Sequence, residues 1–340
     1  MSHEALFQKS AVGGVRRWVG AALGALVLTL SALVLAPPGG TAGASTPASP
    51  APAPAAVLVP PAGYWMLGGD GGVFTYSVPF WGSAAADATA CPANPPGRDM
   101  PGGSCWSMAP TSGGSGYWIL NAYSGQVFAF GDAGFYGQPA GTAAYPADAA
   151  DLWPTAIAIV GTPDGRGYWV LEHGLSGLGS VQAFGDAVYY GDEVSTAATT
   201  GHNGYPVGMA ATHDGRGYWI VDSDGGVFCF GDATFEGSMG GTALNAPIVA
   251  MARAPLGVGY WLVASDGGVF TFGDAAFGGS VAGLKLAAPI VGIAANPGGP
   301  GYWLAGADGG VFALGGAPFL GSMGGTTLSR PIFGITSMAA

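Results

Sequence analysis

The chain has 340 residues, of which 49 % are hydrophobic, 9 % are charged and 64 are glycine. This composition is too apolar for a disordered chain, and it contains too many turn residues for long helices. Acidic residues outnumber basic ones by 20 to 9, which gives a net charge of −11 and argues against nucleic acid as a partner, because an acidic surface repels phosphate.

Residues 1–44 have the organisation of a secretory signal. Arg16 and Arg17 precede an apolar run over residues 18–36, and Ala42-Gly43-Ala44 offers the small residues that a signal peptidase cleaves. The apolar run is long, so an uncleaved anchor that crosses the membrane once is the alternative. Residues 45–62 form a Pro/Ala-rich linker. We therefore expect a secreted protein, or one tethered to the cell surface by its N-terminal segment.

Six repeats occupy residues 63–340. Each contains a Gly-Tyr-Trp triplet, and the six tryptophans are Trp65, Trp118, Trp169, Trp219, Trp261 and Trp303. The last three are 42 residues apart, and one of these units reads GYWLVASDGGVFTFGDAAFGGS from Gly259 to Ser280. Self-similarity at such a period indicates a repeat architecture.

The unit over residues 247–288 predicts four short strands, at 247–252, 259–264, 269–272 and 276–280. Asp266-Gly267-Gly268 suits a tight hairpin turn, because glycine accepts the positive φ that such turns require. The strands carry apolar residues on both faces, which is typical of a sheet covered on both sides. Four-stranded sheets packed face to face around an axis form a β-propeller, and the Tyr-Trp pair of each unit would fill the space between blades.

The two ends of the repeat region predict how the propeller closes. The residues before Gly63 are too few to supply a first strand for that unit, whereas residues 331–335 form a first strand with no unit behind it. We expect this C-terminal strand to complete the blade that begins at Gly63, which gives six blades. A seventh, degenerate blade or an open array is the alternative.

The tandem GYW…DGGVF…FGDAxFxGS units resemble repeats found in secreted proteins of actinobacteria. The resemblance covers residues 63–335, with the motif sharpest in the last three units. It implies a β-propeller and an extracellular setting, and it carries no established activity. WD40 and kelch repeats have a similar length, but this chain lacks the Trp-Asp ending of the first and the separated Tyr and Trp of the second.

Cys91 and Cys105 flank an insertion in the first unit, and a disulfide between them is expected in an oxidising compartment. Cys229 stands where other units have Thr271 or Ala313, so we expect a buried small apolar residue. The sequence has no Cys-x-x-Cys pair, and it predicts neither a metal nor a cofactor. The aspartates of the DGG and GDA motifs could form a ring of calcium ligands, but acceptance of hydrogen bonds within turns is the favoured role.

The first three units carry longer loops than the last three, and these loops should emerge on one face of the propeller. Binding residues are often carried on loops above a rigid scaffold. The candidate ligand-binding residues are Tyr145, Trp153, His173, Asp192, His202, Asn203 and Tyr205. Neutral drift of solvent loops is the alternative.

We predict a module that binds an extracellular glycan, a cell-wall polymer or a protein. Aromatic residues would stack on sugars, while loop Asp and Asn form hydrogen bonds. One alternative is a glycoside hydrolase or lyase that uses Glu172 or Glu193 in a carboxyl pair. The other alternative is a structural spacer without a ligand.

Overall fold

The computed structural model describes residues 62–86, 105–139, 156–174, 177–196, 203–255 and 257–338. Its eighteen elements are all β-strands, which form six antiparallel sheets of three strands each, so the predicted all-β class is confirmed. Residues 1–61, with the predicted signal and almost all of the predicted linker, lie outside this range. Within the range, no helical segment has the length and hydropathy of a membrane span.

We number the sheets from 1 to 6 in the order of their Gly-Tyr-Trp strands and give the strands of each from the inside outward. Sheet 1 contains β18 (Ile332–Ser337), β1 (Tyr64–Gly68) and β2 (Val73–Tyr76). Sheet 2 contains β3 (Trp106–Pro110), β4 (Gly116–Asn121) and β5 (Val127–Gly131). Sheet 3 contains β6 (Ala156–Gly161), β7 (Gly167–His173) and β8 (Gly179–Gly185).

The remaining sheets repeat this order. Sheet 4 contains β9 (Pro206–Ala211), β10 (Gly217–Asp222) and β11 (Val227–Gly231). Sheet 5 contains β12 (Ile248–Arg253), β13 (Tyr260–Ala264) and β14 (Val269–Phe272). Sheet 6 contains β15 (Ile290–Ala295), β16 (Tyr302–Gly306) and β17 (Val311–Leu314).

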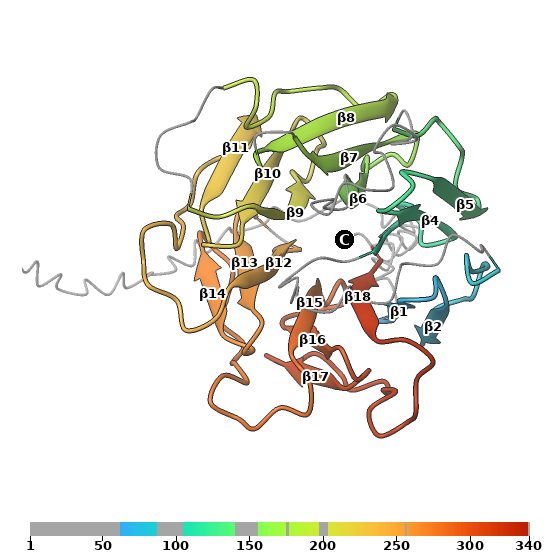
Figure 1. The fold of residues 1–340 in the computed structure, drawn as a ribbon, viewed down its shortest axis with the longest axis vertical. Helices are drawn as coiled ribbons and strands as arrows, with labels where there is room; N and C mark the ends of the chain where they lie inside the picture. Colours follow the sequence, from blue (N-terminus) through green and yellow to red (C-terminus); the bar gives the residue numbers. More distant parts are fainter. Residues whose placement is uncertain are drawn as a thin grey trace, which may run out of the picture. The chain divides into compact units, whose positions relative to one another are not determined.

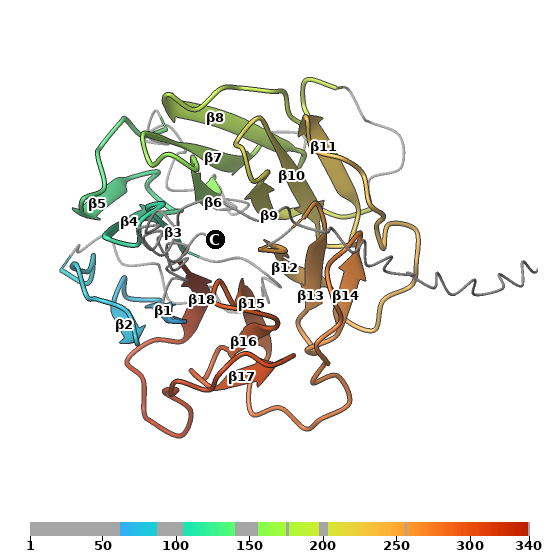
Figure 2. The ribbon, with the colours of Figure 1, turned by 180° about the vertical axis from the view of Figure 1, so that it is seen from behind.

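The six sheets are arranged around a central axis, and their innermost strands are β18, β3, β6, β9, β12 and β15 (Figure 1). Each inner strand contacts the inner strands of both neighbouring sheets, and β18 contacts both β15 and β3. Seen from behind, β2, β5, β8, β11, β14 and β17 again lie on the outside (Figure 2). We call the end of the axis where the inner strands begin the upper face, and the end where they finish the lower face.

The Gly-Tyr-Trp strands are buried on both faces, as their unbroken apolar character predicts. The tryptophan of each sheet contacts the tyrosine of the next sheet, with ring centroids 5.0–5.8 Å apart at all six interfaces. The sixth of these contacts joins Trp303 to Tyr64 of sheet 1. The Tyr-Trp pair therefore packs between sheets, as the sequence predicts.

The C-terminal strand pairs with the first Gly-Tyr-Trp strand, and this prediction is confirmed. β18 runs antiparallel to β1, with Tyr64 opposite Ser337 and Leu67 opposite Gly334. An apolar cluster around Ile332, Tyr64 and Trp303 packs sheet 1 against sheet 6. Sheet 1 is therefore assembled from two segments at opposite ends of the described chain.

The predicted fourth strand is wrong. After β14, residues 276–280 form no ladder with a neighbour, and the corresponding segments of the other sheets are also irregular. Side chains satisfy the backbone of these segments instead: Trp261 Nε1 donates to Ala276 O at 2.9 Å, and Gly278 N donates to the Tyr302 hydroxyl of the next sheet at 3.2 Å. The strong β character of the unit ends before this segment because glycine and alanine supply no β propensity.

Candidate functional site

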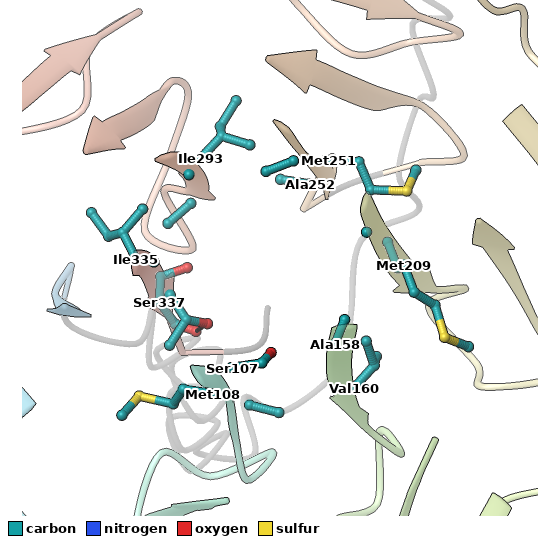
Figure 3. Close-up of a pocket in the computed structure, with 18 of the residues that line it drawn as sticks. Ser107, Met108, Ala158, Val160, Met209, Met251, Ala252, Ile293, Ile335 and Ser337 are labelled. Carbon is teal, nitrogen blue, oxygen red and sulfur yellow. Dashed lines mark hydrogen bonds between the residues drawn. The ribbon is translucent and has the colours of Figure 1, made fainter. Parts of the chain in front are cut away.

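A cavity of about 910 Å³ lies on the axis and is lined mainly by the six inner strands. Ser107 and Ser337 face it, whereas Met209 and Met251 turn away into the sheets (Figure 3). The inner strands are rich in small residues, and a Cβ on Gly292 would lie only 3.2 Å from the Ile335 side chain of the adjacent inner strand. Small residues therefore allow the inner strands to approach one another while they leave the axis open.

The cavity has different chemistry at its two ends. Val207, Val249 and Phe333 line it near the upper face, whereas Arg253 and His213 line it near the lower face. Arg253 Nη1 lies 3.3 Å from His213 Nδ1, and burial lowers the pKa of the guanidinium. No Asp or Glu occurs among the described residues that line the cavity, although the whole chain is acidic. The sequence analysis passed over Arg253, although the equivalent ends of the neighbouring inner strands are uncharged, as at Ala211 and Ala295.

On the upper face, the structure brings two of the predicted ligand-binding residues together. His173 ends β7 and Tyr205 precedes β9, and their ring centroids are 6.1 Å apart. Both side chains are partly exposed, and the neighbouring Asn203 is exposed. Burial lowers the pKa of His173 to about 4, so its imidazole is neutral at physiological pH. This pair offers two aromatic rings and hydrogen-bonding atoms without a formal charge.

Tyr205 is held to the hairpin between β10 and β11. Its backbone N–H donates to Ser223 Oγ at 3.2 Å, and its carbonyl accepts the Ser223 N–H at 2.8 Å. Burial raises the pKa of the tyrosine hydroxyl, so the group stays protonated and able to donate. Two bonds therefore fix the backbone of Tyr205, which carries the aromatic ring that sheet 4 contributes to the pair.

Glu172, the first candidate catalytic residue, lies beside this pair at the end of β7. Its Oε2 accepts a hydrogen bond from Gln182 of β8, the strand that pairs with β7. Burial raises the pKa of the carboxyl group, and the glutamine opposes that shift. The carboxylate is thus bound within sheet 3.

Asp192 and Glu193, both predicted to be functional, are buried, at 6 % and 0 % exposed. Asp192 Oδ2 accepts the Val181 N–H at 3.1 Å, and Glu193 Oε2 accepts the Gly179 N–H at 2.6 Å. These bonds attach the segment that leaves sheet 3 to β8. Both side chains therefore stabilise the loop rather than facing solvent.

A third carboxyl group, which the sequence did not reveal as a candidate, completes this cluster. Asp222 ends β10, is 1 % exposed, and its side chain is hydrogen-bonded to that of Glu193. Burial, followed by the charge of Asp224, raises the pKa of Asp222 to about 7, which the bond to Glu193 opposes. The repeat did not single out Asp222, because the equivalent position varies: it is Asn121 and Glu172 in two sheets and Ala264 and Gly306 in two others.

The repeated aspartates serve turns, as the sequence favours. In the DGG motifs, Oδ1 of each Asp accepts the N–H of the glycine two residues later at 2.9–3.0 Å, in the residues Asp70, Asp224, Asp266 and Asp308. In the GDA motifs the bonds reach the turn that precedes the Gly-Tyr-Trp strand, as when Asp232 accepts from Thr212 Oγ1 at 3.1 Å. In the described ranges, no group of three or more potential ligands could hold a metal ion.

Several predicted residues lie outside the described ranges, namely Tyr145, Trp153, His202 and Cys91. The ligand roles of the first three and the disulfide between Cys91 and Cys105 stay predictions. Cys229 lies in β11, is a free thiol, and packs partly buried against the core between sheets 4 and 5. Burial raises its pKa to about 11, which leaves the thiol protonated.

No family model and no curated protein matches this sequence. Among solved structures, the chain is similar to the β-propeller domain of Myceliophteria thermophila Cps50 (Swd1), with 9 % identity and a TM-score of 0.39. The match covers 65 % of this chain and 73 % of that one.

Proposed function

We propose that the six sheets are the blades of one β-propeller that the pairing of β18 with β1 closes. Two observations support closure at six. Six apolar clusters each join two neighbouring sheets, and one of them joins sheet 6 to sheet 1. In addition, the Tyr64 hydroxyl donates to Gly321 O, which repeats between sheets 6 and 1 the bond found at the other interfaces. A seventh blade would have to separate groups that are in contact.

The function proposed for this propeller is binding, at its upper face, of an extracellular glycan, a cell-wall component or a protein. One observation carries the proposal: the rings of His173 and Tyr205 are accessible and preorganised, while the acidic residues around them are bonded within the fold. A preorganised aromatic pair binds with little loss of conformational entropy. The predicted leader and the extracellular motif resemblance support secretion or tethering to the surface.

Catalysis is the second candidate function, because Glu193 and Asp222 form a carboxyl pair with one raised pKa. Glycoside hydrolases use such pairs across the scissile bond. Here both carboxyl groups are sealed from solvent, so a substrate could reach them only after the loop that carries Glu193 opened. The geometry therefore favours binding over hydrolysis.

The test is a binding screen of the full chain, oxidised so that disulfides form, against immobilised cell-wall polymers and glycans. Release of reducing sugar is measured in the same wells. We expect retention without product, and we expect Tyr205→Ala to weaken the retention of at least one ligand of the screen at least tenfold. Leu284→Ala is the matched control, because Leu284 is 60 % exposed on a connecting loop of the shorter-looped half.

Product release that Glu193→Gln abolishes would replace binding by hydrolysis. If Tyr205→Ala and His173→Ala leave the retention of every retained ligand unchanged, the aromatic pair is refuted as a ligand site. A chain that retains nothing across the screen would favour the spacer.

A further inference from the structure

Six aromatic side chains, one in each sheet, stand exposed at the same position of the repeat. They belong to the irregular segment that follows the outermost strand, and we call them the rim aromatics: Phe80, Phe135, Tyr189, Phe235, Phe277 and Phe319. The five phenylalanines are 58–63 % exposed and Tyr189 is 49 % exposed. Single exposed apolar residues are common on protein surfaces, but six at one repeat position are not scattered.

Two buried side chains hold the backbone on either side of each rim aromatic. The carbonyl before it accepts a hydrogen bond from the tryptophan Nε1 of its own sheet, at 2.7–2.9 Å in all six copies. The N–H after it donates to the tyrosine hydroxyl of the next sheet, at 3.1–3.3 Å in sheets 1 to 5. In sheet 6, Leu320 and Tyr64 form the equivalent bond. The Tyr-Trp pair of the repeat thus fixes the backbone that carries the exposed ring.

The other recurrent residues of this segment have structural roles. The glycine two residues after the ring takes a positive φ, 130° at Gly237, and a Cβ there would lie 2.6 Å from the Phe272 ring. In sheet 3 the residue between them, Tyr190, donates to Gly215 O at 3.2 Å and braces the next sheet. Among the apolar positions of this segment, only the rim aromatic is exposed in every copy, so packing does not account for its recurrence.

The arrangement favours a repeating ligand over a compact one. A compact protein partner would cover one continuous patch of about 800 Å² on this chain. The rim aromatics are instead separated, one to a sheet, so a long polymer could engage several of them in turn. Repeated weak contacts add avidity without any strong single site.

Charge excludes the anionic polymers. The chain carries a net charge of −11, and in sheets 2 to 5 an exposed aspartate precedes the rim aromatic by three residues: Asp132, Asp186, Asp232 and Asp274. These carboxylates repel phosphate, sulfate and uronate groups. An exposed ring offers its face to the C–H groups of a sugar, and a nearby carboxylate can accept hydrogen bonds from hydroxyls.

We propose that the rim aromatics form a multivalent binding surface for a neutral polysaccharide. The surface is distinct from the His173–Tyr205 pair, and either can exist without the other. Each rim site binds one sugar face weakly, and affinity arises from successive sites along one polymer chain. The proposal also explains why an exposed aromatic residue recurs in all six units, because a single ligand pocket would need no such recurrence.

Affinity electrophoresis tests this proposal with the full chain, in native gels that contain hydroxyethyl cellulose, laminarin or dextran, or polygalacturonate as the anionic control. We expect retardation by at least one of the three neutral glucans and none by polygalacturonate. The triple variant Phe235→Ala, Phe277→Ala, Phe319→Ala should lose at least about 100-fold in apparent affinity, since avidity contributes on the order of 10²–10⁴. Phe277→Ala alone should lose only a few fold.

Two variants control for stability and for the ring itself. Leu284→Ala removes an equally exposed apolar side chain and should change nothing. Phe277→Tyr keeps an aromatic face, as Tyr189 does naturally, and should bind as the parent does. The rim variants should unfold within a few degrees of the parent, because the deleted rings are mostly in solvent.

Retardation that persists in the triple variant overturns the proposal, as does the absence of retardation by all three neutral glucans. Rim-dependent capture of a protein partner without glucan binding would overturn the assignment to polysaccharide. Tyr205→Ala should leave glucan retardation intact. If that variant abolishes it, the ligand site is the upper-face pair and the rim proposal is wrong.

Discussion

Sheets 4, 5 and 6 and sheet 3 stabilise the same hairpin in different ways. In the regular sheets, the hairpin aspartate accepts a hydrogen bond from a backbone N–H two residues later, as in Asp266. An apolar side chain, such as Met239 or Val281, lies under the hairpin glycine. This solution is local, so each 42-residue unit carries it complete.

Sheet 3 has a longer hairpin, and carboxylates from the following segment hold it. Glu193 occupies the position that Met239 and Val281 occupy in the regular sheets, since its N–H also bonds to a carbonyl of the hairpin. Its side chain is buried against Asp222 of the next sheet. A departure from the repeat has thus replaced apolar packing with a buried ionisable pair, at the interface that carries the His173–Tyr205 rings.

The largest expected effect on stability comes from the Trp–Tyr packing between adjacent sheets, which the regular sheets and sheet 3 share. Trp303→Ala should cost about 3–5 kcal/mol in the free energy of unfolding, because the side chain is fully buried between sheets 6 and 1. Denaturant unfolding followed by tryptophan fluorescence measures this loss. Trp303→Phe keeps the ring but loses the bond to Pro318 O, and it should cost less. A loss below about 1 kcal/mol for the alanine variant would contradict the proposed closure of the ring.

The next largest effect is on the pH dependence of stability, which the buried groups at the interface of sheets 3 and 4 should dominate. The pKa of Asp222 is raised to about 7 in the fold, so the folded state holds a proton that the unfolded chain releases above its ordinary value of 3.8. Asp222 therefore makes stability fall as pH rises from about 4 to about 7. The pKa of His173 is lowered from 6.5 to about 4, so this residue makes stability rise with pH over 4 to 6.5. The two slopes oppose each other in the parent.

Asp222→Asn removes one of these slopes. The variant should gain stability relative to the parent at pH 8, and its stability should rise between pH 4 and 6.5 by at most roughly 1.4 kcal/mol per pH unit. Thermal unfolding at a series of pH values measures both effects. An unaltered profile in Asp222→Asn would mean that this carboxyl group does not titrate as the geometry indicates.

The smallest effect on stability compares two carboxylates that accept backbone hydrogen bonds, one from a separate strand and one within its own turn. Asp192→Ala should cost about 1–3 kcal/mol, because it leaves the buried N–H of Val181 without an acceptor and also removes the bond to the Ser195 N–H. Asp266→Ala should cost about 1 kcal/mol or less, because water can replace its bond in a partly exposed turn. Equal losses in chemical denaturation would remove the distinction between the two kinds of hairpin.

Most of the fold could be predicted from the sequence, because six copies of one motif show the same pattern of strands and turns. The Gly-Tyr-Trp strands, the DGG hairpins and the pairing of residues 331–335 with the first unit were all predictable from period and composition. The fourth strand was not, because its hydrogen bonds go to Trp261 Nε1 and the Tyr302 hydroxyl, and strand patterns do not register side-chain partners.

The site was less predictable, for a different reason. Loop length located the region of His173 and Tyr205, but it said nothing about burial, so Asp192 and Glu193 appeared as surface candidates. Asp222 and Arg253 become significant only when sheets 3 to 5 are side by side. The rim aromatics were visible in every copy of the motif, yet only their exposure shows that packing does not require them.

The pairing of β18 with β1 has a consequence for the order of folding. Sheets 2 to 6 each consist of three consecutive strands and can form soon after synthesis, since their contacts are local. Sheet 1 cannot, because Tyr64 must wait for Ser337 to emerge. Until then, β1 exposes an unpaired strand edge, which is the kind of edge that pairs with other chains. Aggregation during synthesis should therefore arise from β1, and a chaperone that protects this edge would act on that strand.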